Sequence, residues 1–164
     1  MVIGCDISKE MLTVAINKNF KITTPNLIRC DVEYLPFKND VLDCIISIRL
    51  MGHIPPQNRI SITNEFKRIT KQWIIISYAN SITIGGLFRR IKSFIYHDEW
   101  YQINPKSLEQ ELNDQDLQIK LIEYLQTEIP DKRFHSIITH FQNLLLKYFA
   151  ETYIVLIEKK NEKV

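Results

Sequence analysis

Two aspartates stand at the ends of apolar, strand-like runs, where carboxylates can bind hydroxyl and amine groups. The run "VIGCDI" ends around Asp6, and "NLIRCD" ends at Asp31. In an open α/β sheet, ligands bind outside the carboxyl ends of the strands. A carboxylate there can accept hydrogen bonds from both hydroxyls of a ribose, and a second one strand away can accept from an exocyclic amine. Either aspartate alone is more typical of a solvated loop, but the pair predicts half of a nucleoside site.

Polar residues also follow the next two strand-like runs. Ser47 ends "LDCIIS", and Arg49 and His53 follow it, while "WIIISYA" is followed by Asn80. A histidine acts as a general base only when a substrate proton lies within hydrogen-bond reach. The sequence alone therefore leaves His53 as either a candidate general base or, equally, a polar loop histidine.

The elements that would position these residues alternate between strand and helix patterns, which predicts an α/β layer fold. The near-continuous isoleucine content of "LDCIISI" predicts a strand buried on both faces, as in a parallel sheet. Prolines predict two helix starts, at Pro55-Pro56 and at Asn104-Pro105. The other expected elements are helices over Ser8–Ile16 and Ser136–Phe149, and strands at "LQIKLIEYL" and "TYIVLIEKK".

The composition of the chain limits the classes of function that it can have. The 164 residues are 45% hydrophobic and 24% charged, with a net charge of +2, so no electrostatic signal for a large nucleic-acid footprint arises. No apolar run approaches the roughly 18 residues that span a bilayer, and no signal-peptide pattern is present. Cys5, Cys30 and Cys44 lack metal-binding spacing and are interpreted as small buried hydrophobes in a reducing compartment. We therefore expect a cytoplasmic protein without a metal site.

Three stretches, in order and spacing, carry a family resemblance: "VIGCDISKEMLTVA", "DVEYLPFKNDVLDCIISIRLMGHI" and "NEFKRITKQWIIIS". They resemble the class I S-adenosylmethionine-dependent methyltransferases, and most closely the type 11 group, over roughly residues 2–80. The middle motif, "D-x-E-x-LPF" followed by "LDCIIS", is the specific part, and the "E-x-x-R" pattern of Glu65 and Arg68 supports it. The resemblance implies a Rossmann-like α/β sheet with helices on both faces.

The same resemblance implies roles for individual residues. Asp6 would hold the ribose hydroxyls of S-adenosylmethionine, and Ile7 and Met11 would flank its adenine. Asp31 would accept from the adenine amine, and Val32 would contribute its backbone N–H. Ser47 and Ile48 would lie beneath the methionine portion of the cofactor, and His53 would face the substrate side of the cleft.

One departure from the family pattern concerns the start of the fold. In the family, the strand that ends at Asp6 is the second, and the preceding strand carries a glycine-rich turn. Neither the strand nor the turn is present here, so we expect an N-terminally truncated fold that lacks the first strand and helix. The missing strand would lie between the strands of Asp6 and Cys44, and its absence leaves either a gap or a direct pairing of those two. A fragment of a longer or split protein, a degenerate copy, or a partner chain that supplies the strand would each explain it.

We expect a single domain over residues 1–164, with a cofactor-side half (1–80) and a variable substrate or lid region (81–164). In the latter, "FRRIKSFIYHDEWYQ" is more typical of an amphipathic helix packed on the sheet than of an apolar-substrate lid. The expected function is methyl transfer to a small-molecule, lipid or quinone-like acceptor. The alternatives are a tRNA-uridine methyltransferase and a non-catalytic scaffold remnant of the methyltransferase fold.

Overall fold

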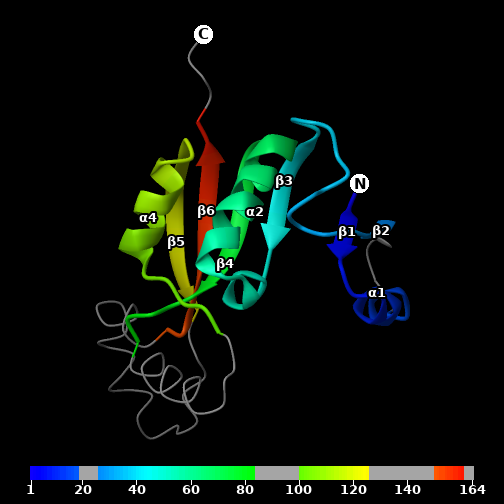
Figure 1. Ribbon diagram of the computed structural model, residues 1–164, viewed down its shortest axis with the longest axis horizontal. Helices are drawn as coiled ribbons and strands as arrows, with labels where there is room; N and C mark the ends of the chain where they lie inside the picture. The colour runs from blue at the N-terminus through cyan, green and yellow to red at the C-terminus, as the bar shows by residue number, and fades with distance from the viewer. Residues whose placement is uncertain (19–25, 84–99, 126–149, 161–164) are drawn as a thin grey trace, which may run out of the picture.

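The β-strands and helices of the computed structural model follow each other in the predicted α/β order (Figure 1). The structure describes residues 1–18, 26–83, 100–125 and 150–160. The elements are β1 (Ile3–Asp6), α1 (Lys9–Ile16), β2 (Asn26–Arg29), β3 (Leu42–Ser47), a 3₁₀ turn (Met51–His53), α2 (Pro56–Ile69), β4 (Thr70–Ala79), α4 (Pro105–Asn113), β5 (Leu117–Leu125) and β6 (Thr152–Lys159). The predicted helix over 136–149 and most of the segment "FRRIKSFIYHDEWYQ" lie outside the described residues.

The N-terminal unit is a small parallel pair of strands with one helix. β1 pairs with β2 in register Ile3 to Asn26, and α1 connects them. None of the described residues before Leu35 is buried. Met11 and Ile16 of α1 are more than half exposed. This unit is therefore held mainly by backbone hydrogen bonds and partly buried contacts.

The second sheet has four strands in the order β3-β4-β6-β5. β3 runs parallel to β4, whereas β6 runs antiparallel to both of its neighbours, β4 and β5. Within the part of the chain that the structure describes, no strand pairing joins this sheet to the β1-β2 pair. Of the two expected outcomes, a gap or a direct pairing of the strands of Asp6 and Cys44, the structure has the gap.

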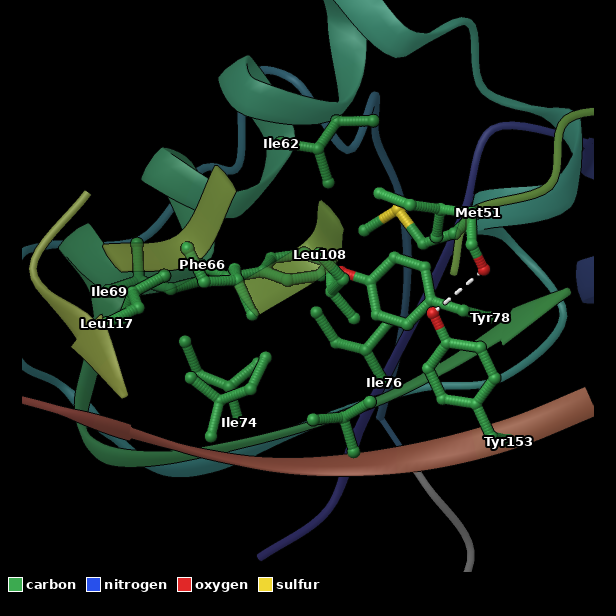
Figure 2. Packing of buried hydrophobic residues seen from close by; sticks show 14 of the residues in the cluster. Met51, Ile62, Phe66, Ile69, Ile74, Ile76, Tyr78, Leu108, Leu117 and Tyr153 are labelled. Atoms are coloured by element: carbon green, nitrogen blue, oxygen red, sulfur yellow. Dashed lines mark hydrogen bonds between the residues drawn. The ribbon is translucent and has the colours of Figure 1, made fainter. Parts of the chain in front are cut away.

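The hydrophobic core lies between the four-stranded sheet and the helices α2 and α4, which cover the same face of the sheet (Figures 1 and 2). Phe66 of α2 and Leu108 of α4 pack there against Ile74 and Ile76 of β4. The predicted apolar spacing of α2, with Ile62, Phe66 and Ile69, is confirmed because all three are buried. The core thus fixes the position of β3 and of the loops at its carboxyl end.

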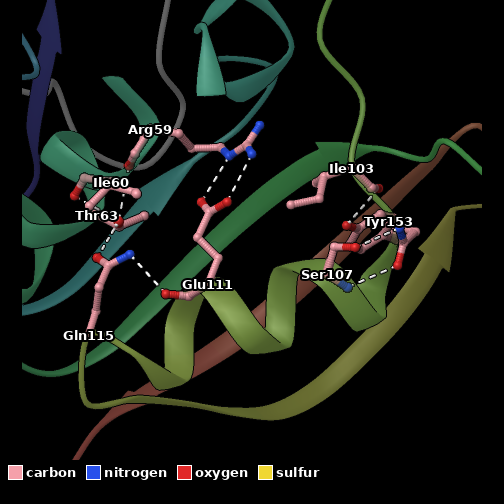
Figure 3. Close-up of polar contacts among 9 residues, drawn as sticks. Arg59, Ile60, Thr63, Ile103, Ser107, Glu111, Gln115 and Tyr153 are labelled. Carbon is pink, nitrogen blue, oxygen red and sulfur yellow. Dashed lines mark hydrogen bonds and ion pairs between the residues drawn. The ribbon is translucent and has the colours of Figure 1, made fainter. Parts of the chain in front are cut away.

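Polar side-chain contacts join α2 to α4 and the residues that follow it, at the edge of this core (Figure 3). The Arg59 guanidinium donates two hydrogen bonds of 2.9 Å to the Glu111 carboxylate, and both side chains are largely buried. Thr63 donates a 2.6 Å hydrogen bond to the side-chain oxygen of Gln115. Because a buried guanidinium needs a partner, the position of α4 depends on this pair as well as on apolar packing.

Two expectations about burial are wrong, and both have the same physical reason. β3 is not buried on both faces: Ile46 is 66% exposed. Cys5 and Cys44 are exposed and Cys30 is half-buried, so they are not core residues. All of these residues line the gap between the two sheets. The burial predicted for them requires a neighbouring strand at that place.

Candidate functional site

A cavity of about 780 Å³ occupies the space between the β1-β2 pair and β3. Its volume falls within the range of small-molecule and cofactor pockets. Every residue singled out from the sequence as a cofactor or substrate contact lies in its wall. These are Asp6, Ile7, Met11, Asp31, Val32, Ser47, Ile48 and His53. The structure therefore brings together residues from four separate loops and elements.

Asp6 ends β1 and shapes the turn into α1. Its Oδ1 accepts a 2.8 Å hydrogen bond from the backbone N–H of Ser8. Ser8 in turn caps α1 by accepting from the N–H of Met11 at 3.1 Å. These two bonds explain why the short sequence "DISKEM" turns sharply from strand to helix. The turn leaves the second carboxylate oxygen of Asp6 for a ligand in the cavity.

Asp31 repeats this arrangement one strand away. Its Oδ1 accepts a 3.0 Å hydrogen bond from the N–H of Glu33. Glu33 also lines the cavity, and its carboxylate accepts from the Asn58 side chain at 2.9 Å. The carboxyl ends of β1 and β2 thus present three carboxylates, which favour a ligand that carries hydroxyl, amine or cationic groups.

The "LPF" loop that follows is held by the "E-x-x-R" motif of α2. Arg68 donates to the backbone carbonyls of Leu35 and Phe37, at 3.0 and 2.7 Å. Glu65 accepts from the Leu35 N–H at 3.1 Å and pairs with Arg68 at 2.7 Å. The hydrogen bonds from Arg68 hold the pKa of Glu65 below its usual value. The two motifs therefore form one structural unit that fixes a wall of the cavity, because Leu35 and Phe37 both line it.

Ser47, at the end of β3, is buried, whereas the next residue, Ile48, is half exposed. The next residue, Arg49, has a left-handed backbone with φ of 63°. Its N–H donates a 2.7 Å hydrogen bond to Oγ of Ser77 on β4, which holds this unusual conformation. Arg49 lines the cavity, but its position after the strand was its only sequence signal, and no role was predicted for it. No glycine or asparagine at this position signals the positive φ.

His53 lies in the cavity wall, and the Trp100 ring lies edge-on to it with ring centroids 4.6 Å apart. The tryptophan also sits against Gly52, where a Cβ atom would lie 2.7 Å from the ring. A hydrogen bond of 2.8 Å from the Tyr101 N–H to the Gly52 carbonyl holds the two segments together. The glycine is thus required for the close approach that orients His53.

The three cysteines line the same cavity as the carboxylates. Desolvation, reinforced by a hydrogen bond with Cys30, raises the pKa of Cys5 to about 12. Desolvation also raises the pKa of Cys44. Because the thiolate is the nucleophile, neither residue is suited to covalent chemistry at neutral pH. Among the described residues, no group of three or more histidine, cysteine or acidic side chains is arranged to hold a metal ion. No helix of the described chain is long and apolar enough to cross a membrane.

Comparison with known protein families gives one match, and it covers the N-terminal part of the chain, which contributes most of the cavity wall. Residues 1–72 match the family model of a methyltransferase domain. No curated protein sequence matches the chain significantly.

Solved structures match over nearly the whole chain. A magnesium protoporphyrin IX methyltransferase from Synechocystis with bound S-adenosylhomocysteine is 18% identical, with a TM-score of 0.69, and 98% of this chain is covered. An S-adenosylmethionine-dependent methyltransferase from Methanosarcina mazei is 15% identical, with a TM-score of 0.70 and 98% covered. A third match is in the complex between the Haloferax volcanii Trm112 methyltransferase activator and a methyltransferase that is described as putative. The matched chain is 15% identical, with a TM-score of 0.70, and 99% of this chain is covered.

A smaller share of each of the matched chains is covered by this one. This chain spans 64% of the Synechocystis enzyme, 82% of the Methanosarcina protein and 72% of the matched Haloferax chain. The relatives therefore contain segments that have no counterpart here.

Proposed function

We propose that this chain, which has the fold of the class I S-adenosylmethionine-dependent methyltransferases and matches a methyltransferase domain over residues 1–72, binds S-adenosylmethionine in the cavity between its two sheets and takes part in methyl transfer. One observation carries the proposal. All eight residues that the sequence resemblance selects line this single cavity. The proposed acceptor is a small molecule or a lipid- or quinone-like compound, and the proposed location is the cytoplasm.

The chemistry of the wall fits this cofactor. Asp6 and Asp31 each engage one carboxylate oxygen in a local turn, at 2.8 and 3.0 Å, which fixes the carboxylate and leaves the other oxygen for ribose hydroxyls or an adenine amine. Ile7 and Met11 are 61% and 57% exposed and offer apolar surface against a base. S-adenosylmethionine supplies an activated methyl group on a cationic sulfonium.

Positioning is the main contribution expected from the protein, because the sulfonium leaving group is already activated. Ser47 and Ile48 would support the methionine portion of the cofactor from the end of β3. His53, held edge-on by Trp100, would face the acceptor. We assign His53 a positioning role on the acceptor side, and no general base is required.

Calorimetric titration of the full chain with S-adenosylhomocysteine tests the proposal. Asp6→Ala and Asp31→Ala are each expected to weaken binding by at least about tenfold, since a hydrogen bond to a charged group contributes roughly 1.5–3 kcal/mol. Asp43→Ala is the matched control, because Asp43 is an exposed aspartate on β3 that does not line the cavity. Saturable binding that survives both substitutions would place the ligand elsewhere and overturn the assignment.

The gap between the sheets also favours a second candidate, a non-catalytic methyltransferase-like subunit. In that case the chain would fold and bind a partner, but no cofactor. Absence of S-adenosylhomocysteine binding by the folded chain would favour this candidate over the enzyme. The tRNA-uridine alternative gains no support from the described cavity wall, which has three carboxylates, those of Asp6, Asp31 and Glu33, against a single arginine, Arg49.

A further inference from the structure

A buried serine interrupts the isoleucine-rich run of β4. Ser77 follows three consecutive isoleucines in "WIIISYA" and is 2% exposed. A buried hydroxyl is costly unless it is hydrogen-bonded. Within the described residues, its Oγ has one hydrogen-bond partner, the backbone N–H of Arg49, which donates to it at 2.7 Å. This bond is therefore the reason that a polar side chain is tolerated at this position.

The same bond ends β3. The ladder between β3 and β4 pairs Ser47 with Ile76. With the same spacing, a continued β3 would pair Arg49 with Tyr78. Instead, the Arg49 N–H donates to the side chain of Ser77, and the Arg49 backbone turns to a φ of 63°. A residue other than glycine adopts this left-handed conformation at a cost that surrounding contacts must offset, and the Ser77 hydroxyl supplies such a contact.

The left-handed turn sets the direction of residues 48–53, the β3 loop, which forms one wall of the cavity. Its lining residues are Ile48, Arg49, Leu50 and His53. Met51, between them, is 1% exposed and belongs to the hydrophobic core. The far end of the loop is fixed at Gly52, whose carbonyl accepts from the Tyr101 N–H. Ser77 therefore holds the near end of a loop whose middle and far end are anchored elsewhere.

Ser77 does not itself line the cavity. A ligand in the cavity meets the β3 loop and not the serine, so any effect of Ser77 on binding passes through the shape of that loop. The opposite wall, with Asp6 and Asp31, belongs to the β1-β2 unit. In the part of the chain that the structure describes, that unit shares no strand pairing with β4. The two walls can therefore be perturbed separately.

We infer that Ser77 is a positioning residue of the cofactor site. Its hydroxyl holds Arg49 in the left-handed conformation, and the β3 loop thereby keeps the shape that receives the methionine portion of S-adenosylmethionine. This inference rests on the proposed function, in which Ser47 and Ile48 support that portion of the cofactor. Loss of the hydroxyl weakens binding at the amino-acid end of the ligand and spares the adenosine end.

Calorimetric titration of the full chain with two ligands tests the inference. S-adenosylhomocysteine carries both ends, whereas 5′-methylthioadenosine has the adenosine and the sulfur but lacks the amino-acid group. Ser77→Ala is expected to weaken S-adenosylhomocysteine binding on the order of tenfold, because the loop then spends only part of its time in the binding shape. Binding of 5′-methylthioadenosine is expected to change by less than about twofold, because the β1-β2 wall is untouched.

Two further variants separate positioning from general destabilisation. Thr63→Val removes another buried hydroxyl, which bonds to Gln115 and does not line the cavity, so neither affinity should change. Arg49→Gly removes the need for the bond, because glycine adopts the left-handed conformation without steric cost. Adding Ser77→Ala to Arg49→Gly should therefore weaken S-adenosylhomocysteine binding by less than about twofold relative to Arg49→Gly alone.

Amide hydrogen exchange gives a measurement without ligand. The Arg49 N–H loses its acceptor in Ser77→Ala, so its exchange should be on the order of tenfold faster than in the wild type. Amides of β5, at the other side of the sheet, should exchange at unchanged rates.

Equal weakening of both ligands by Ser77→Ala, or weakening of neither, would overturn the inference. A tenfold loss that persists in the Arg49→Gly background would overturn it as well, and so would unchanged exchange of the Arg49 amide. In each of these cases the wild-type chain still binds S-adenosylhomocysteine, and the proposed function stands. A wild-type chain that binds neither ligand would instead overturn the proposed function and this inference with it.

Discussion

The β1-α1-β2 unit and the four-stranded sheet differ in how they are held together. All residues buried in the described chain lie at Leu35 or later, so the core belongs to the sheet with α2 and α4. The N-terminal unit has regular strands and a capped helix but no buried side chain. Yet it carries Asp6 and Asp31, the two carboxylates of the candidate site. Correct local structure is therefore separable from burial, and the unit that contributes Asp6 and Asp31 to the candidate site is the one with the weaker packing.

The largest expected contrast comes from truncating one apolar side chain in each region. Phe66→Ala removes a core ring and is expected to lower the free energy of unfolding by about 3–5 kcal/mol. Met11→Ala removes a side chain that is 57% exposed, and its effect should stay within about 0.5 kcal/mol. Urea denaturation followed by circular dichroism measures both. A comparable loss for Met11→Ala would mean that α1 is packed in solution and that the contrast between the regions is wrong.

The next contrast concerns ion pairs. Glu111→Ala leaves the Arg59 guanidinium buried without a partner and is expected to cost about 3 kcal/mol. Asp43→Ala breaks the exposed pair with Lys71 and should have no measurable effect. Thermal unfolding of the two variants sharpens the comparison, because both remove one carboxylate. Equal melting temperatures would show that α4 does not depend on the buried pair.

Two glycine substitutions probe the tightness of packing in each region. Gly52→Ala would place a Cβ atom 2.7 Å from the Trp100 ring and is expected to destabilise the protein by about 1–3 kcal/mol. Gly4→Ala meets the end of the Leu27 side chain at the same distance, but that side chain is half-buried and can turn aside, so its cost should stay within about 0.5 kcal/mol. Tryptophan fluorescence and chemical denaturation distinguish the two. A costly Gly4→Ala would reveal rigid packing in the N-terminal unit.

The smallest expected effect is a pH dependence of the free energy of unfolding, caused by the Glu65–Arg68 pair that holds the loop between β2 and β3. Arg68 lowers the pKa of Glu65 below its ordinary value of 4.5. The stabilisation is therefore fully present above about pH 4.5 and is lost as the pH falls through the lower, folded-state pKa. Glu65→Gln lacks this ionisation, so the stability difference from the wild type should narrow in acid. Parallel stability curves of the two proteins from pH 6 to pH 3 would contradict the assignment.

The sequence predicted most elements because the local signals agree with the final structure. The capping serine of α1, the proline starts of α2 and α4, and the alternating pattern of β5 are all confirmed. The resemblance to class I methyltransferases is confirmed by the family match over residues 1–72 and by the shared fold. The roles of the individual cavity residues stay predictions.

Burial could not be predicted in the same way. An isoleucine-rich run is typical of a strand covered on both sides, but Ile46 is exposed, and no strand among the described residues pairs with β3 on the side away from β4. Burial depends on what lies beside a strand, and that is not encoded in the strand itself. The left-handed Arg49 and the packing of Trp100 on Gly52 are likewise tertiary features, without a local sequence signal.

The distribution of thiols gives the molecule an intrinsic chemical reporter. The chain has three cysteines, and all three line the one cavity between the sheets. A thiol-directed reagent such as a maleimide can therefore label only the cavity, and it reacts slowly with Cys5 and Cys44 at neutral pH because desolvation raises the pKa of both thiols. Whatever fills the cavity slows the modification, so its occupancy can be read by mass spectrometry on the unaltered protein, in a purified sample or in a cell extract.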